Sequence, residues 1–349
     1  ARVETSGGAV TTATGAVSTM VLTAAADPSV ITGTSVYKVS SATPGVYAAV
    51  GTVDSVSSDR LTVTLKAAVT GTLAGANAVA WTRSNDANPD TIVFGGGQTP
   101  GQTVGNGRAT AMVLTREGAH VIVVDRKLQL AQETADLIQK ANGKAQAMQC
   151  DATQEEQVQS VIIKVHQQLG RIDILHNNIG ASIELGDQSA DLLTEEAFDR
   201  SFAVNLKSSW LSIKHVLPIF RKQNKGSIVN ISSLAAAQAY PLLGYKTMKA
   251  AVISMTENVA AANASYGIRA NAILPGLMNT PMAIESRVGQ GRAREEVIAA
   301  RDSRIPLGKK MGTGWDVANA ALFLHSDEAA FITGIALIID GGERVVHGL

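Results

Sequence analysis

The stretch DTIVFGGGQTPGQTVGNGRATAMVL, residues 90–114, decides the fold. It starts with an apolar run of β-formers, Thr91–Phe94, passes through a glycine-rich turn, Gly95–Gly107, and continues as an amphipathic helix, Arg108–Glu117. Glycines let the backbone adopt positive φ and approach a phosphate that any Cβ would exclude. The start of a helix offers unpaired N–H groups. A strand, a glycine turn and a helix in this order predict a nucleotide-binding unit.

Such a turn is by itself equally typical of a surface loop, so the prediction depends on the residues beyond it. Strand-forming runs occur at 120–124, 145–149, 172–175, 227–231, 268–274 and 336–339, with helical patterns at 128–142 and 154–169 between the first three. The second helix carries signals at both ends, because Thr153 and Glu156 can form a capping box and Gly170 can stop it.

Largely apolar strands that alternate with helices imply a parallel sheet that is covered on both faces. We therefore expect a doubly wound, Rossmann-like α/β domain over residues 85–349. Residues 1–84 differ, being rich in Ala, Thr, Val, Gly and Ser with few charges. Residues 60–66 alternate apolar and polar side chains after a polar turn at 57–59, which predicts a hairpin. We expect a small all-β N-terminal module of about five strands there, with a flexible Thr/Ala-rich leader as the alternative.

The whole chain of 349 residues has 30 basic and 30 acidic side chains and one cysteine, Cys150. This balance provides no cluster of positive charge for a nucleic acid. A single cysteine cannot form an internal disulfide, so we expect a reducing compartment, the cytoplasm. No apolar run approaches the ~20 residues of a spanning helix, so we expect no membrane insertion. No group of His, Cys, Asp and Glu has metal-ligand spacing, so we expect no metal.

An acidic residue, Asp125, ends the strand after the glycine turn, about 30 residues beyond Gly95. A carboxylate at this point accepts hydrogen bonds from the ribose hydroxyls of a dinucleotide and repels a 2′-phosphate. The sequence therefore favours NAD over NADP. The adjacent Arg126 keeps NADP as the alternative, unless it is only a solvated cation at the start of the next helix.

The segment YKTMK, residues 245–249, opens an apolar helix after a strand that ends in IVNISS. A spacing of four places Tyr245 and Lys249 about one turn apart on one helical face. Hydride transfer at a carbinol carbon needs a proton to move at the oxygen, and a tyrosine with a pKa near 10 is a poor base at neutral pH. An ammonium about 4 Å away at an effective dielectric of about 20 contributes roughly 4 kcal/mol, on the order of three pKa units. We therefore predict that Lys249 lowers the pKa of Tyr245.

From about residue 90 to the C-terminus, the chain resembles the short-chain dehydrogenases/reductases of the compact type. These enzymes carry a T-G-x-x-x-G-x-G turn, to which Phe94-Gly95 and Gly105-Asn106-Gly107 correspond, with a segment between them that is about six residues longer here. The resemblance implies cofactor contacts at Gly95, Gly105, Asn106, Gly107, Asp125, Asp151, Asn177, Gly180, Tyr245, Lys249, Pro275, Gly276 and Thr280.

In this family the tyrosine is the acid/base, the lysine lowers its pKa and holds the nicotinamide ribose, a serine fixes the substrate oxygen and an asparagine continues a proton relay. The matching residues here are Tyr245, Lys249, Ser233 and Asn205. Counted from the strand end the serine is Ser233, and counted back from Tyr245 it is Ser232. Both serines stay open, with Ser233 preferred.

The resemblance implies an NAD(P)-dependent oxidoreductase that interconverts a secondary alcohol and a ketone. Its substrate is expected to be a small molecule and its cofactor NAD. The alternatives are a binding or assembly protein that uses the fold as a scaffold, and a sugar epimerase or dehydratase, whose relatives usually have a larger C-terminal domain. The family commonly pairs the long helices that match residues 202–223 and 245–264, which implies a homo-dimer or homo-tetramer.

Substrate specificity is expected in three variable stretches, 181–193, 234–244 and 281–312. The second stretch is mostly apolar, which favours an apolar alcohol or ketone. The third carries Arg287 among several arginines and several glutamates, which favours a solvated helical lid over an anion site.

Overall fold

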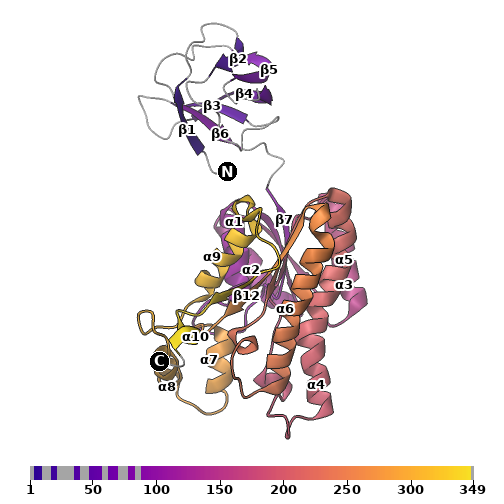
Figure 1. Cartoon of the computed structure of the whole chain (residues 1–349), viewed down its shortest axis with the longest axis vertical. Coiled ribbons are helices and arrows are strands. Elements are labelled where there is room, and N and C mark those ends of the chain that lie inside the picture. The colour runs from indigo at the N-terminus through magenta and orange to yellow at the C-terminus, as the bar shows by residue number, and fades with distance from the viewer. Residues whose placement is uncertain are drawn as a thin grey trace. The chain divides into compact units, whose positions relative to one another are not determined.

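The computed structural model describes residues 88–346 throughout and, before them, the backbone of six strands (Figure 1). The chain divides into two units, Ala1–Asn88 and Pro89–Leu349. The described strands of the first unit are β1 Glu4–Ala9, β2 Val17–Val21, β3 Ser35–Val39, β4 Tyr47–Val56, β5 Thr62–Val69 and β6 Ala78–Thr82. They pair antiparallel in the order β1-β6-β3-β4-β5-β2. The predicted turn at 57–59 lies outside the described residues.

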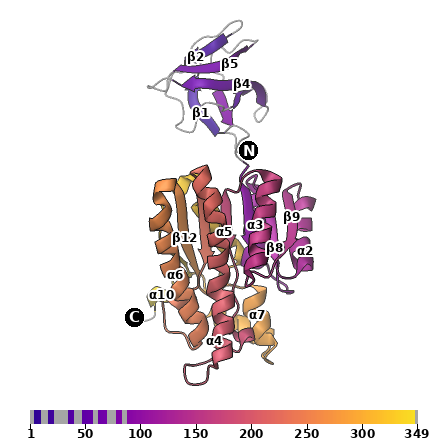
Figure 2. The ribbon, with the colours of Figure 1, turned by 90° about the vertical axis from the view of Figure 1, so that its right-hand side faces the viewer.

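The second unit is built on one parallel seven-stranded sheet with helices on both faces (Figure 1, Figure 2). Its strands are β7 Asp90–Phe94, β8 His120–Asp125, β9 Lys144–Gln149, β10 Ile174–Asn177, β11 Gly226–Ile231, β12 Ile268–Pro275 and β13 Ala336–Ile339. Its helices are α1 Asn106–Arg116, α2 Leu128–Lys140, α3 Glu155–Leu169, α4 Glu195–Phe202, α5 Ser208–Gln223, α6 Leu243–Asn263, α7 Pro281–Val288, α8 Arg294–Asp302, α9 Gly314–His325 and α10 Glu343–Val346. Among the described residues, no helix combines the length and apolar character that crossing a membrane requires.

Alternate side chains of each central strand enter different layers of the core. On β7, Ile92 and Phe94 pack with side chains of α3 and α5, whereas Val93 packs with side chains of α1 and α2. All three are completely buried, and burial of such a side chain stabilises the fold by about 1.5–3 kcal/mol. Because both faces are covered, the strand is continuously apolar, which confirms the predicted parallel sheet with helices on both sides.

The strand order places the expected ligand site. The sheet runs β13-β12-β11-β10-β7-β8-β9, so the chain moves from β7 outward to β9 and then returns to the other side of β7. The ends of β7 and β10 lie side by side, with Phe94 opposite Asn177. Ligands of open α/β sheets bind outside the carboxyl ends of the strands where the order reverses, so the glycine turn after β7 stands at this point.

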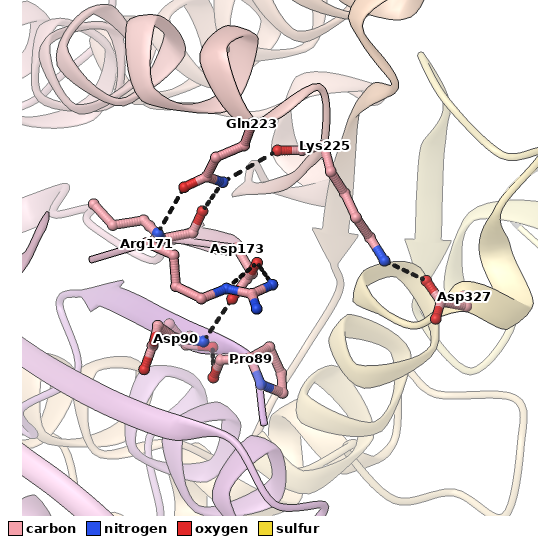
Figure 3. A network of polar contacts seen from close by, with 9 residues as sticks. Pro89, Asp90, Arg171, Asp173, Gln223, Lys225 and Asp327 are labelled. Atoms are coloured by element: carbon pink, nitrogen blue, oxygen red, sulfur yellow. Dashed lines mark hydrogen bonds and ion pairs between the residues drawn. The ribbon is translucent and has the colours of Figure 1, made fainter. Parts of the chain in front are cut away.

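Polar contacts fix the amino ends of the central strands (Figure 3). The carboxylate of Asp173 accepts the backbone N–H of Asp90 at 2.9 Å and pairs with the guanidinium of Arg171. The side chain of Gln223 bonds to both the N–H and the carbonyl of Ile172, at 3.1 and 2.6 Å. These contacts lie at the strand starts, so they set the register of β7 and β10 from the edge opposite the expected site.

The helix predicted at residues 154–169 begins at Glu155, but its predicted capping box is wrong. Its N-cap is Gln154, which makes no side-chain capping bond. The backbone N–H of Thr153, which a capping box would bond to Glu156, instead donates to Oδ1 of Asp151 at 3.0 Å. The hydroxyl of Thr153 donates to the same oxygen at 2.7 Å. The predicted stop is confirmed, since Gly170 ends the helix in the left-handed conformation with φ of 76°.

Candidate active site

The glycine turn brings the first turn of α1 against the end of β7. Gly95 has φ of +72°, in the left-handed region that favours glycine. A Cβ on Gly107 would lie 2.1 Å from the carbonyl oxygen of Gly95 and 2.5 Å from Nδ2 of Asn178. The same Nδ2 donates to the carbonyl of Gly95 at 3.1 Å. The backbone therefore requires glycine at both positions, independently of any ligand.

The longer segment of this turn is closed by the side chain of Gln98. Its Nε2 donates to the carbonyl of Thr103 at 3.0 Å, and its Oε1 accepts the N–H of Gly105 at 2.8 Å. At the other end of the segment, a Cβ on Gly101 would lie 2.8 Å from Cβ of Pro281, so the tip packs against α7. The extra residues form an internally bonded loop, and Gly105 still precedes α1 directly.

The start of α1 fits the pyrophosphate of a dinucleotide. The helix has no side-chain cap, so its first amide groups remain for an external anion. At this helix and in the loop before α7, the Oδ1 atoms of Asn106 and Asn279 are buried without a hydrogen-bond partner among the described residues. Buried polar atoms ordinarily have partners, so both amides fit the polar groups of a bound cofactor.

The two predicted acidic residues lie at successive strand ends. Asp125 ends β8, and a Cβ on Gly97 would lie 2.6 Å from its Oδ2, so the carboxylate faces the glycine turn. Its Oδ1 accepts the backbone N–H of Lys127 at 3.0 Å. Asp151 follows β9 and accepts hydrogen bonds from the N–H and the hydroxyl of Thr153. Asp125 therefore lies at the turn, whereas Asp151 is engaged in the loop before α3.

The two asparagines at the end of β10 have different surroundings. Asn177 is 1% exposed. Its Oδ1 accepts from Oγ of Ser212 at 2.8 Å, and its Nδ2 donates to Oδ1 of Asn230 at 2.9 Å. The side chain of Asn177 thus ties α5 and β11 together inside the core, although the family motif predicts a cofactor contact for this residue. Asn178, to which the sequence assigned no role, is the one that contacts Gly95.

The predicted nicotinamide-binding segment lies between β12 and α7. Pro275 ends β12, and the N–H of Gly276 donates to the carbonyl of Ile339 at 2.8 Å. A Cβ on Gly276 would lie 2.7 Å from Cβ of Asp340. Thr280 is 6% exposed and is the N-cap of α7. The segment is therefore held against the end of β13 by a contact that glycine alone permits.

The first turn of α6 is capped by an acidic residue that the sequence did not reveal. Asp187, which is 6% exposed, accepts the backbone N–H of Gly244 at 2.8 Å and that of Tyr245 at 2.6 Å. Two of the unpaired donors at the helix start are thereby satisfied. Asp187 lies 57 positions before Gly244, so no local capping pattern announces it. It fixes the helical turn that carries Tyr245.

Lys249 is buried among backbone carbonyls. It is 2% exposed, and its Nζ donates to the carbonyl of Ile231 at 2.8 Å and to that of Ile179 at 3.0 Å. The Nζ lies 5.8 Å from the ring centroid of Tyr245. A Cβ on Gly180 would lie 3.0 Å from the same Nζ. The fold thus brings together Gly180, Tyr245 and Lys249, which three separate parts of the motif pattern had predicted.

Asn205 lies in a π-helical segment, Ala203–Lys207, between α4 and α5. It is completely buried, and its amide bonds to both backbone groups of Ala181, accepting from the N–H at 3.0 Å and donating to the carbonyl at 2.8 Å. Its Oδ1 would be 3.3 Å from a Cβ on Gly180. Single-turn π segments are frequent at functional sites. Asn205 therefore contacts the loop 179–181, which also contacts Lys249.

The two candidate serines differ in their contacts. Ser232 is 2% exposed, and its hydroxyl donates to the backbone carbonyl of Lys249 at 2.7 Å. The hydroxyl of Ser233 accepts the N–H of Ala235 at 3.2 Å, and its interaction with the phenol of Tyr245 lowers the pKa of that phenol in part. Of these two hydroxyls, the one beside the phenol is that of Ser233.

The charge state of the pair differs from the sequence prediction. Burial raises the pKa of Tyr245 to about 12, and the hydrogen bond with Ser233 opposes this only in part. Burial lowers the pKa of Lys249 to about 7, because the ammonium loses its hydration. The prediction that Lys249 lowers the pKa of Tyr245 is therefore wrong for the polypeptide alone. For both groups, desolvation is the largest cause of the pKa shift.

Comparison with known protein sequences assigns this chain to one family. Residues 102–343 match the family model described as enoyl-(acyl carrier protein) reductase. A 2-(R)-hydroxypropyl-CoM dehydrogenase of Xanthobacter autotrophicus is 37% identical over 251 residues, which are 70% of this chain and 97% of that relative. A 3-oxoacyl-(acyl-carrier-protein) reductase of Thermotoga maritima is 38% identical over 69% of this chain and 94% of its own.

The solved structures agree. A structure described as that of a short-chain dehydrogenase/reductase from Burkholderia xenovorans superposes with a TM-score of 0.67 at 36% identity, covering 74% of this chain and 97% of that chain. The two chains thus share a fold. The chain therefore belongs to the short-chain dehydrogenase/reductase family and is an oxidoreductase that acts between alcohols and ketones.

Proposed function

We propose that this protein is an NAD-dependent enzyme that interconverts a secondary alcohol and a ketone, with Tyr245 as its acid/base. The observation that carries the proposal is the convergence of Lys249 and Asn205 on the loop 179–181, beside a phenol whose pKa Ser233 lowers in part. A protein that used the fold only as a scaffold would not need these four side chains together. We therefore favour the enzyme over an assembly role.

The residues of the chain would act on the substrate oxygen. The nicotinamide, when bound, accepts a hydride from the carbinol carbon or returns one to the ketone. In oxidation, the alcohol proton passes to Oη of Tyr245, and the hydroxyl of Ser233 holds the same substrate oxygen. In reduction, the phenol gives its proton to the forming alkoxide. The raised pKa of Tyr245, about 12, keeps the phenol protonated at neutral pH, as the reductive direction requires.

The assay that tests this function follows nicotinamide absorbance with NAD⁺ and NADP⁺ against a panel of secondary alcohols, and with the reduced cofactors against the matching ketones. Turnover of at least one pair, lost when the proposed acid/base is removed, is the expected result. Cofactor binding without turnover of any compound in either direction would count against the enzyme and favour the scaffold role.

NAD is the proposed cofactor because the carboxylate of Asp125 faces the glycine turn. We expect Asp125→Ala to weaken NADH binding by about tenfold, since a hydrogen bond to a charged group contributes about 1.5–3 kcal/mol. NADPH binding should strengthen, because the repulsion of its 2′-phosphate is removed. Fluorescence titration with both reduced cofactors measures the two affinities. Asp136→Ala, which removes an exposed carboxylate from the following helix, α2, is the matched control.

This cofactor proposal has a clear counter-result. Equal affinities of the unmodified protein for NADH and NADPH would show that Arg126 or the longer turn overrides the carboxylate. An unchanged ratio of affinities in the Asp125→Ala variant would equally remove Asp125 from cofactor choice.

Self-association through α4, α5 and α6 is also proposed. Phe202 and Trp210 expose 42% and 45% of their surface, and with Met255 they line a surface hollow of about 260 Å³. In a two-fold dimer both subunits contribute the same patch, so one substitution alters the interface twice. We expect sedimentation equilibrium to show a homo-dimer or homo-tetramer, and Trp210→Arg to shift it towards monomer. Leu192→Arg, which alters another exposed apolar residue, should leave the assembly unchanged. A monomeric parent protein would overturn this proposal.

For the rest of the chain, we propose an all-β module over residues 1–84 and a catalytic domain over residues 85–349. The two parts are proposed as separate domains of the chain.

A cytoplasmic location also stays a prediction, and it rests on Cys150 as the single cysteine. Burial raises the pKa of this thiol to about 12, so it is a poor nucleophile at neutral pH.

A further inference from the structure

The arginines of α7 and of the segment that follows it differ in whether a carboxylate neutralises them. Arg294 forms two hydrogen bonds with Glu285, at 2.9 and 2.6 Å. Arg304 is paired with the buried carboxylate of Glu343. Within residues 88–346, neither Arg287 nor Arg301 forms an ion pair with a carboxylate. Glu285, the acidic residue nearest to Arg287 in sequence, forms its ion pair with Arg294 instead.

Both unpaired guanidinium groups are anchored by neutral acceptors. Nη1 of Arg287 donates to the carbonyl of Ala283 at 2.7 Å, within α7. Nε of Arg301 contacts the sulfur of Met311 at 3.2 Å, and its Nη2 reaches the carbonyl of Met278 at 3.5 Å. Met278 belongs to the loop between β12 and α7 that carries the predicted nicotinamide contacts. These contacts orient the two side chains without cancelling their charge.

Tyr240 connects this pair of arginines to the proposed acid/base. Its ring centroid lies 5.9 Å from that of Tyr245. Burial raises the pKa of its hydroxyl, and the charges of Arg287 and Arg301 both oppose this rise, so both guanidinium groups act on Tyr240. The two guanidinium groups therefore lie one aromatic ring away from the phenol that would act on the substrate oxygen.

The electrostatics of this cluster leave positive charge in excess. Burial lowers the pKa of Arg301 to about 10, and repulsion from Arg287 and Arg304 contributes to this shift, while Glu343 opposes it. Two guanidinium groups and one carboxylate thus act on Arg301, while the carboxylate of Asp187 acts on Tyr240. A second anion would relieve the repulsion, and the planar fork of a guanidinium matches the paired oxygens of an oxoanion.

We propose that Arg287 and Arg301 bind an anionic group of the substrate, a carboxylate or a group of the same shape and charge, on a molecule whose alcohol or ketone lies at Tyr245. This inference rests on the proposed function and adds a substrate class to it. It also departs from the apolar substrate that the sequence favoured.

The test uses matched pairs of ketones that differ only in charge. 3-Oxobutanoate, 4-oxopentanoate and 5-oxohexanoate are each compared with the corresponding neutral amide. Reduction is followed with the unmodified protein and with Arg287→Gln, Arg301→Gln and Arg287→Lys. Arg292→Gln removes an exposed arginine from the same segment and serves as the control. Thermal unfolding of each variant shows whether it is folded.

For at least one chain length, we expect kcat/KM for the carboxylate to exceed that for the amide by about ten- to a hundredfold, which is the range for hydrogen bonds to charged groups. Arg287→Gln and Arg301→Gln should remove most of this preference while leaving the amide unaffected, and Arg287→Lys should restore part of it. Equal kcat/KM for carboxylates and amides would overturn the anion site. Equal losses for both compounds in the glutamine variants would do the same.

A binding measurement separates the anion site from the proposed function. Calorimetric titration of the same carboxylates and amides into the protein with NADH does not depend on turnover. Charge-selective binding that is lost in Arg287→Gln, without turnover of any ketone, would leave the anion site standing and remove the proposed function. Turnover without any charge preference in binding would do the opposite.

Discussion

Replacement of Tyr245 by Phe is expected to lower turnover by about two to four orders of magnitude, the range that a positioned acid/base contributes. The change removes one oxygen atom and keeps the ring that packs beside Tyr240, with centroids 5.9 Å apart. The backbone N–H of this residue still donates to Asp187 at 2.6 Å, so α6 should begin as before. We therefore expect cofactor affinity and thermal stability to change little. Steady-state kinetics in both directions and NADH titration measure these quantities.

Tyr266→Phe is the matched control, since it removes a hydroxyl at the far end of the same helical region, where the side chain is 41% exposed. Its turnover should equal that of the parent protein.

The unmodified protein should also oxidise alcohols faster as pH rises, because the pKa of Tyr245 is raised to about 12 and the base is its deprotonated form. Near-full activity of Tyr245→Phe would remove this residue as the acid/base.

Gly107→Ala should damage both the fold and the cofactor site. Alanine in place of glycine ordinarily favours a helix by about 1 kcal/mol, but here its Cβ would lie 2.1 Å from the carbonyl oxygen of Gly95. That carbonyl cannot withdraw easily, because the N–H of Gly95 is bonded to Val124 at 2.8 Å and Asn178 bonds to the carbonyl itself. Overpacking of this kind costs about 1–3 kcal/mol, so we expect net destabilisation in thermal unfolding and loss of NADH binding by tenfold or more.

Gly105→Ala provides the informative comparison in the same turn. Gly105 has φ of −76°, and a Cβ on it would meet only Gln98, at 3.7 Å. The fold should therefore keep its stability in this variant. If a pyrophosphate approaches the turn, NADH binding should nevertheless fall. A Gly107→Ala protein as stable as the parent would show that the contact between α1 and β7 can relax.

The order of the elements was predictable because its signals are local. The apolar run at Thr91–Phe94, the glycine turn and the acidic end of the next strand are each read from adjacent residues, and the spacing between Tyr245 and Lys249 follows from helical geometry. The capping box at Thr153 failed for a related reason. A competing acceptor for the N–H of Thr153, the carboxylate of Asp151, stands two residues away, and the pattern alone does not rank it against Glu156.

The chemistry of the site was only partly predictable. Tyr245, Lys249, Ser233 and Asn205 are identified by the family resemblance, and the choice between Ser232 and Ser233 needed the position of each hydroxyl. The charge state of the pair needed the burial of both groups. A Coulomb estimate at a fixed distance and dielectric omits the desolvation that dominates once a lysine is 2% exposed.

By itself, the sequence determined a parallel α/β sheet, a glycine turn at its centre and the residue types of an alcohol–ketone oxidoreductase, because hydrophobic periodicity and motif spacing are properties of the chain. Tertiary structure alone decided that Asp187 caps the helix of Tyr245, that Asn178 bonds to Gly95 and that Glu285 pairs with Arg294, which leaves Arg287 without a carboxylate partner among residues 88–346. Hydrogen bonds and ion pairs depend on distance and direction in space, and many of the groups involved lie tens of residues apart. Only the packed fold brings such groups within reach of one another.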